Sequence, residues 1–170
     1  MKDDDKIKKI VWTGLLTAMV AVGTMIRVPY PMANGYLNAG DAIVMVSAFL
    51  LTPWCGAFAA GVGSALTDFL YGMAIYAPAT LVIKGCMALA AGAILRALRN
   101  KKPIFPAILA CTAATVILFA GYFGYELLIF GWGGAIADLV PNLLQGAFGT
   151  AAGTALFYAL MRIPYVREHF

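Results

Sequence analysis

The sequence predicts an all-helical membrane protein, and three features support this class. Of the 170 residues, 62% are hydrophobic and 12% are charged, with a mean hydropathy of +0.85. A soluble domain is closer to half apolar and a quarter charged. Several apolar runs approach the roughly 20 residues that a helix needs to cross a bilayer, and basic residues gather between these runs. We therefore expect one membrane domain over residues 1–170.

Six transmembrane helices are predicted from the apolar runs and the residues that interrupt them. Pro29 ends the first run, Pro53 marks the turn after the second, and Pro78 suits the first turn of the fourth. The Gly-rich stretch 131–138 is predicted to be a loop that could include a helical turn, and the polar start MKDDDK is left outside the fold. The expected spans are residues 8–28, 38–52, 54–71, 78–97, 104–127 and 139–161.

The positions of Lys and Arg predict the orientation. Ten of the 12 lie at or before the start of the first span, at or after the end of the fourth, or after the sixth, and the exceptions are Arg27 and Lys84. Cytoplasmic segments of membrane proteins carry an excess of these residues. With six spans, all three clusters lie on one side, so we expect the N- and C-termini to be cytoplasmic.

Polar side chains concentrate in the outer half of the predicted spans. Lys84 lies about six residues into its span, roughly 9–10 Å below the outer surface, and ionisable groups at such depth indicate function. Two alternatives stay open: Asp41 could simply cap its helix, and Asp68 could pair with Lys84 structurally. Asn38 is a better candidate than Asp41 for touching a ligand. The expected ligand-binding residues are Asn38, Asp41, Asp68, Tyr76, Thr80, Lys84, Tyr125, Glu126, Asn142 and Gln145.

Aromatic residues crowd the same outer side, among them Tyr76, Tyr125 and Trp132. An interfacial belt accounts for some of them, and their excess over the inner side indicates ring-stacking surfaces. Aromatic walls with a few placed polar groups are typical of a small-molecule site. This combination suits a small, polar, heteroaromatic compound. Arg27 and Asp138 are interpreted as interfacial or loop charges.

Several function classes are disfavoured by the same pattern. No chain of polar residues crosses the inner half, as a proton relay or ion channel would need, and the sequence contains no Walker A motif. No nucleophile–base pair indicates an enzyme, and the single His169 and the three cysteines lack metal-ligand spacing. The clustered basic residues do not suggest nucleic acid. We expect no catalytic site, no metal and no cofactor.

Two stretches carry a family resemblance: YLNAGDAIVMVSAFLLTPWCGAFAAGVGSALTDFLYG (36–72) and IYAPATLVIKGCMALAAG (75–92). With their N-x-G-D and A-P-A-T-x-x-I-K-G strings, they resemble the substrate-binding S components of energy-coupling factor (ECF) vitamin transporters, in particular the pyridoxine/hydroxymethylpyrimidine-type branch. The resemblance implies high-affinity binding of a small water-soluble vitamin or precursor, such as a vitamin B6 vitamer or hydroxymethylpyrimidine. It also implies a prokaryotic cell membrane and a site facing outward.

The resemblance further implies partners, namely a transmembrane coupling subunit and two ATPase subunits. A small-x-x-x-small pattern on the first span would contact the coupling subunit. Two overlapping pairs fit this pattern, Gly14 with Ala18 and Thr17 with Ala21, and the sequence does not choose between them. Two functions of other classes stay open: a self-sufficient small permease or channel, and a structural assembly protein whose polar residues join helices.

Overall fold

The computed structural model describes residues 2–29, 36–102 and 104–169, and the fold is helical, as predicted. Four helical stretches of the described residues are long and apolar enough to cross a membrane: Lys6–Met25, Ala77–Ala97, Ile104–Ala137 and Leu139–Leu160. The elements in chain order are α1 (Lys2–Met25), β1 (Arg27–Pro29), β2 (Tyr36–Asn38), α2 (Gly40–Leu50), α3 (Pro53–Leu70), α4 (Ala77–Ala97), α5 (Ile104–Ala137), α6 (Leu139–Leu160) and α7 (Pro164–His169).

Three predicted spans differ from the structure in their bounds. The first was predicted at 8–28, but α1 already begins at Lys2, within the polar start that was left out of the fold, and it ends at Met25, before the strand Arg27–Pro29. The second predicted span is a helix of 11 residues, about 16 Å long and so shorter than a hydrocarbon core of about 30 Å. The fifth span does not end at residue 127, and the loop predicted at 131–138 was wrong. α5 continues to Ala137 with a kink at Gly131 (φ 70°, ψ −171°), a conformation open to glycine, so one residue redirects the chain while its neighbours stay helical.

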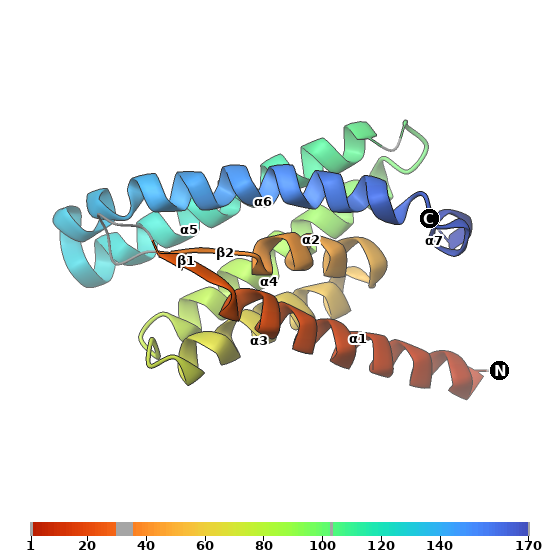
Figure 1. Ribbon diagram of the computed structural model, residues 1–170, viewed down its shortest axis with the longest axis horizontal. Helices are drawn as coiled ribbons and strands as arrows, with labels where there is room; N and C mark the ends of the chain where they lie inside the picture. Colours follow the sequence, from red (N-terminus) through yellow and green to blue (C-terminus); the bar gives the residue numbers. More distant parts are fainter. Residues whose placement is uncertain (1, 30–35, 103, 170) are drawn as a thin grey trace.

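The chain termini and the connections between helices are distributed unequally between the two ends of the helix bundle (Figure 1). Both termini lie at one end together with the α4–α5 connection, and the α3–α4 and α5–α6 connections lie at the opposite end. The basic clusters therefore share an end of the molecule, as the predicted orientation requires. We call the opposite end the pocket end.

α2 occupies the interior of the bundle. It contacts α1, α3, α4 and α6, while α3 packs between α1 and α4. Glycines make the α3 contacts close: a Cβ on Gly63 would lie 2.6 Å from the carbonyl oxygen of Thr17, and one on Gly61 would lie 2.5 Å from that of Leu81. Small residues allow helix backbones to approach in this way within membranes.

A short antiparallel hairpin joins α1 to α2 and positions the start of the site. Its two strands pair in the register Arg27↔Asn38 and Val28↔Leu37. Ala39 extends this contact, because its backbone N–H donates to the carbonyl of Ile26 (3.4 Å). The hairpin therefore fixes Asn38 at the first turn of α2, beside the pocket end of α6, which β2 also contacts.

Candidate ligand-binding site

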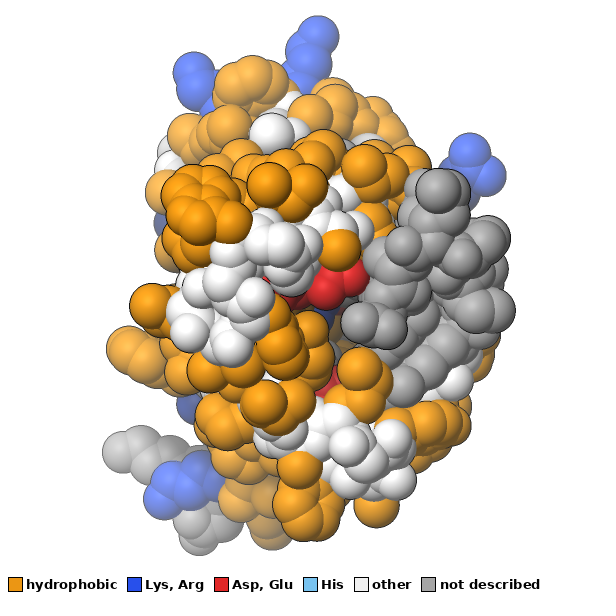
Figure 2. All heavy atoms as spheres, turned by 90° about the vertical axis from the view of Figure 1, so that its left-hand side faces the viewer, with side chains coloured by type: hydrophobic (Ala, Val, Ile, Leu, Met, Phe, Trp, Pro, Cys, Tyr) orange, Lys and Arg blue, Asp and Glu red, His pale blue; other side chains and the backbone are white. Residues whose placement is uncertain are grey.

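A polar pocket opens at the pocket end of the bundle. Seen from this end, acidic side chains are visible within a central hollow, and hydrophobic side chains border much of its described part (Figure 2). The cavity measures about 60 Å³. The described residues that line it are Asn38, Asp68, Met73, Tyr76, Thr80, Tyr122, Glu126, Asp138, Pro141, Asn142 and Gln145.

The N-x-G-D string has a separate structural role for each of its defined positions. The side-chain oxygen of Asn38 accepts a hydrogen bond from the backbone N–H of Gly40 (3.0 Å). Gly40 has no room for a side chain, because a Cβ there would lie 2.2 Å from Oγ1 of Thr24. The N-cap residue of α2 is Ala39, and the Asp41 carboxylate accepts from Lys84 and Gln145 rather than from the helix backbone, so the capping alternative was wrong. Asn38 was the stronger candidate for a ligand contact, yet its side chain stabilises this turn through the hydrogen bond to Gly40.

Lys84 and Asp41 form a buried ion pair beneath the pocket. The ammonium of Lys84 donates to Oδ1 of Asp41, and both residues are only 2% exposed. Gln145 donates from Nε2 to the other carboxylate oxygen of Asp41 (2.8 Å). Lys84 also lies 5.6 Å from the centroid of the Tyr122 ring, within reach of a cation–π contact. The pair joins α2 to α4, and Gln145 of α6 connects it to the pocket.

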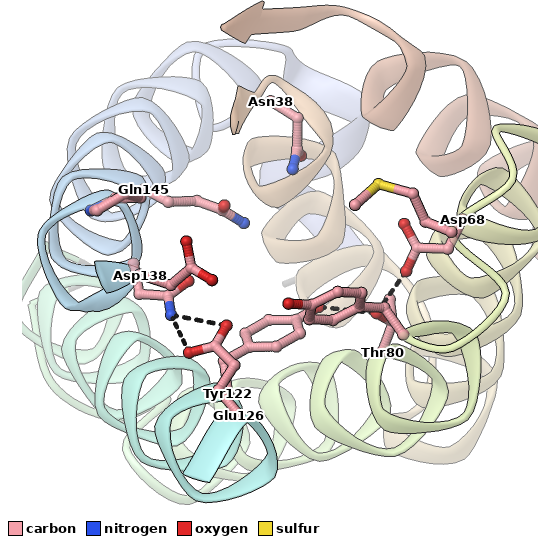
Figure 3. A pocket seen from close by; sticks show the side chains of 11 residues that line it. Asn38, Asp68, Thr80, Tyr122, Glu126, Asp138 and Gln145 are labelled. Atoms are coloured by element: carbon pink, nitrogen blue, oxygen red, sulfur yellow. Dashed lines mark hydrogen bonds between the residues drawn. The ribbon is translucent and has the colours of Figure 1, made fainter. Parts of the chain in front are cut away.

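Asp68 belongs to a different network from Lys84, so the predicted alternative of a pair between them was wrong. Oδ2 of Asp68 accepts a hydrogen bond from the Thr80 hydroxyl (2.5 Å). The same hydroxyl lies 2.9 Å from that of Tyr122, and Figure 3 shows the three side chains together along one wall. Lys84 is one turn further down α4 and points to α2 instead, because Asp41 is the carboxylate at its depth.

Two further carboxylates lie on the opposite wall, between α5 and α6. Both oxygens of Glu126 lie within hydrogen-bond distance of Nδ2 of Asn142 (3.3 and 3.2 Å). Asp138 is 7% exposed, and none of the described residues donates to its Oδ1. Burial raises the pKa of the Asp138 carboxyl above its usual value, because desolvation disfavours the anion.

Aromatic rings close the side of the pocket next to the α3–α4 connection. The ring of Tyr76 lies 5.9 Å, between centroids, from those of Tyr125 and Phe130. Burial, and then the negative charges of Glu126 and Asp138, raise the pKa of the Tyr76 hydroxyl, so it stays a neutral donor. Tyr125 donates its hydroxyl to the carbonyl of Ile75, and so ties the connection to α5.

Seven of the ten predicted site residues line the pocket, and three do not. Asp41 and Lys84 lie beneath it as an ion pair, and Tyr125 holds the α3–α4 connection from outside. The sequence analysis missed four lining residues: Met73, Tyr122, Asp138 and Pro141. Tyr122 had a usable signal, since it lies one helical turn before Glu126 and so on the same face. Asp138 had been interpreted as a loop charge because its stretch was predicted to be a loop.

The two predicted partner-contact pairs lie on different faces of α1. Gly14 and Ala18 are exposed, and nothing lies within 4 Å of a Cβ placed on Gly14. Thr17 is half-buried, and its carbonyl oxygen packs against Gly63 of α3. Ala21 is buried in the core at 7% exposure. Of the two pairs that fit the pattern, only Gly14 with Ala18 presents both members on the outer surface.

Comparison with solved structures defines the class of protein. A structure of the S component of a bacterial ECF transporter matches with a TM-score of 0.70 and 22% identity, covering 92% of this chain and 97% of that chain. The fold is therefore that of an ECF S component. The family model described as the S component of ECF-type riboflavin transporters matches residues 4–162. The chain belongs to this family of multi-pass membrane proteins, whose members are binding subunits of transporters and not enzymes.

Two curated relatives align along most of the chain. An uncharacterised protein of Pyrococcus woesei is 36% identical over 144 residues, which cover 84% of this chain and 95% of the relative. The thiamine precursor transporter HmpT of Lactococcus lactis subsp. cremoris is 28% identical over 151 residues, covering 88% of this chain and 85% of HmpT. The predicted ECF S component is thus confirmed.

Proposed function

We propose that this chain captures a neutral or cationic, single-ring heteroaromatic vitamin precursor of the hydroxymethylpyrimidine type for import by an ECF transporter. The observation that carries the proposal is the composition of the pocket. It is lined by the three carboxylates of Asp68, Glu126 and Asp138 and by the rings of Tyr76 and Tyr122, with no Lys or Arg among its described lining residues.

The charges of this pocket favour a ligand that donates hydrogen bonds. Ionised carboxylates only accept hydrogen bonds, so they suit hydroxyl, amine and protonated ring-nitrogen groups. The two tyrosine rings offer apolar faces against which a flat heterocycle can stack. A phosphate ester would bring negative charge towards three acidic side chains, which is unfavourable at short range in a partly desolvated site. The free vitamer, rather than its phosphate, is therefore the expected cargo.

The size of the cavity supports a single ring. The cavity of about 60 Å³ is small, since about 10–15 Å³ is already the least volume that holds one water. A compact single ring with short substituents suits this space better than a three-ring flavin. The similarity to a thiamine precursor transporter points to the same ligand class. A vitamin B6 vitamer has a similar size and shares the hydroxymethyl group, so it is the closest competitor.

The remaining parts of the proposal concern direction and partners. The basic clusters at the terminal end support a cytoplasmic position for that end, and the pocket would then face outward. The chain would act with a transmembrane coupling subunit and two ATPase subunits, which would supply the energy for uptake. The exposed surface at Gly14 and Ala18 is the proposed contact with the coupling subunit.

Isothermal titration of the purified protein tests the proposed cargo. The panel contains hydroxymethylpyrimidine, its phosphate ester, pyridoxine and riboflavin. We expect hydroxymethylpyrimidine to bind most tightly and its phosphate at least about tenfold more weakly, a difference of about 1.4 kcal/mol. Glu126→Ala should weaken binding, while Leu66→Ala, at an exposed position of α3, serves as the matched control. Tightest binding of riboflavin, or binding of none of the four, would refute the proposed cargo.

A further inference from the structure

The carboxylate of Asp138 is set apart from the other acidic groups of the pocket by its lack of a partner. Asp68 accepts from Thr80, and Glu126 accepts from Asn142. Oδ1 of Asp138 is buried and receives no hydrogen bond from any described residue. Buried polar atoms in folded proteins nearly always have a partner, so an open acceptor on the wall of a pocket needs a donor from outside the chain.

Asp138 also lacks the local hydrogen bond that a residue at its position in the chain usually makes. It is the N-cap residue of α6, yet its side chain makes no capping bond. An N-cap aspartate normally accepts from the backbone N–H two or three positions further on. The third position here is Pro141, which has no N–H to donate. The sequence has thus removed one of the two usual local partners of this carboxylate.

The side chain is directed into the cavity instead. Figure 3 shows the Asp138 carboxylate between Gln145 and Glu126, facing the space enclosed by the labelled residues. The polar neighbours on this wall are already engaged, because Gln145 donates to Asp41 and Asn142 donates to Glu126. An occupant of the cavity is therefore in a position to supply the donor that Asp138 lacks among the described residues.

We infer that Asp138 is the specificity-determining acceptor of the pocket, which binds an N–H donor on the edge of the bound heterocycle. This inference rests on the proposed function, and it names the chemical group that the site selects. A planar edge with an exocyclic amine next to a ring nitrogen offers N–H donors that match the geometry of a carboxylate, and such charge-assisted bonds are the strong ones. Glu126 faces the same space and adds negative potential that favours a protonated ring.

Two ligands that differ in a single substituent test whether Asp138 binds the amine. 4-Amino-5-hydroxymethyl-2-methylpyrimidine carries the amine, and the 4-oxo analogue replaces this donor with an acceptor. We expect the wild-type protein to prefer the amine and Asp138→Asn to bind it about ten- to a hundredfold more weakly, as for loss of a hydrogen bond to a charged group. The preference between the two ligands should also collapse in the variant.

Ser64→Ala is the matched control. Oγ of Ser64 in α3 is the other buried side-chain atom without a partner among the described residues, and Ser64 does not line the pocket. Ser64→Ala removes a buried polar atom that has no hydrogen bond, and Asp138→Asn removes the negative charge from the other buried group of this kind. Only the change at Asp138 should alter the affinity for the amine, so the control separates a ligand contact from a general effect of repacking.

The melting temperature of the ligand-free protein provides the second readout. The pKa of Asp138 is raised by burial above the usual 3.8, so ionisation of this group disfavours the folded state as pH rises through the raised value. The neutral Asp138→Asn protein should therefore melt no lower than wild type at pH 7.5. A lower melting temperature would show that the carboxylate is a structural acceptor and would overturn the inference.

The remaining outcomes are distinguishable. If wild type binds the amine and Asp138→Asn binds it equally well, the inference fails and the proposed function stands. An equal loss of affinity for both ligands would also overturn the inference, because Asp138 would then not read the amine. If wild type binds neither pyrimidine, the proposed cargo fails, and the assignment of the amine to Asp138 fails with it.

Discussion

At the scale of single residues, the pair of Lys84 and Asp41 shows how this chain accommodates charge inside a bundle of apolar helices. Both side chains are almost fully buried, and the carboxylate also accepts from Gln145. Bringing two charges out of water costs several kcal/mol each, and the cost is offset only when the pair is close and its remaining hydrogen-bonding capacity is used. The pair therefore stabilises the contact between α2 and α4 as long as it remains complete.

We predict that Lys84→Met lowers the melting temperature of the purified protein in detergent by roughly 6 °C or more. Removing one partner of a buried pair costs about 3–5 kcal/mol, and about 2–4 °C accompanies each kcal/mol in a protein of this size. Asp41 would be left as a buried anion with only the amide of Gln145 as a donor.

The double variant Lys84→Met, Asp41→Asn is the control, because it removes both charges. It should recover most of the lost stability. A Lys84→Met protein that melts like wild type but loses its ligand would contradict this interpretation. That result would return Lys84 to the role of ligand contact that the sequence suggested.

At the scale of elements, α1 divides its surface between the bundle and the exterior. Leu16, Val20 and Ala21 face inward, whereas Gly14 and Ala18 lie on the exposed side. In lipid, helices associate through close packing at small residues rather than through the hydrophobic effect. The Gly14–Ala18 surface is therefore suited to bind another transmembrane helix.

We predict that Gly14→Leu abolishes co-purification with the coupling subunit and leaves ligand affinity in detergent unchanged. A leucine side chain would hold an approaching backbone away from α1, and Gly14 lies outside the set of pocket-lining residues. Pull-down of the tagged chain co-expressed with its coupling subunit measures the first effect, and titration measures the second. Leu66→Trp, on the exposed face of α3, is the control and should retain the partner. Undiminished recovery of the coupling subunit with Gly14→Leu would show that another face of the chain binds it.

At the scale of the whole molecule, the arrangement in Figure 1 separates the basic end from the pocket end. In the proposed orientation the basic clusters would anchor one end at the cytoplasmic surface, and the acidic pocket occupies the other end. The interior between them is filled by α2, whose residues Val44, Met45, Ala48 and Phe49 belong to the apolar core. Cargo bound at the pocket end therefore meets packed side chains rather than a polar path through the bundle.

We predict that Gly133→Cys reacts with a membrane-impermeant maleimide in intact cells and that Lys101→Cys does not. Both positions are exposed, Gly133 after the kink of α5 at the pocket end and Lys101 in the α4–α5 connection at the terminal end. The native Cys55, Cys86 and Cys111 are first replaced by alanine. Mass spectrometry of the labelled protein measures the reaction. Permeabilised cells should give labelling at both sites, and the reverse pattern in intact cells would invert the predicted topology.

Many of the helix boundaries could be predicted from the sequence because they depend on the local properties of neighbouring residues. Apolar runs and prolines gave α3, α4 and α6 to within about two residues of their ends, since hydropathy and the loss of a backbone N–H act on neighbouring positions. The kink at Gly131 could not be predicted from the sequence. A glycine can end a helix, redirect it or pack within it, and the neighbouring residues do not specify the φ of 70° that Gly131 adopts.

The sequence by itself determined which residues are polar, at which depth they lie and on which side they gather, because membrane solvation acts on each helix separately. Only the tertiary structure decided their partners. It joined Lys84 to Asp41 rather than to Asp68, and it left Asp138 facing the cavity. These choices depend on the rotation and offset of helices that are far apart in sequence, which interlocking side chains and close glycine contacts set across the bundle.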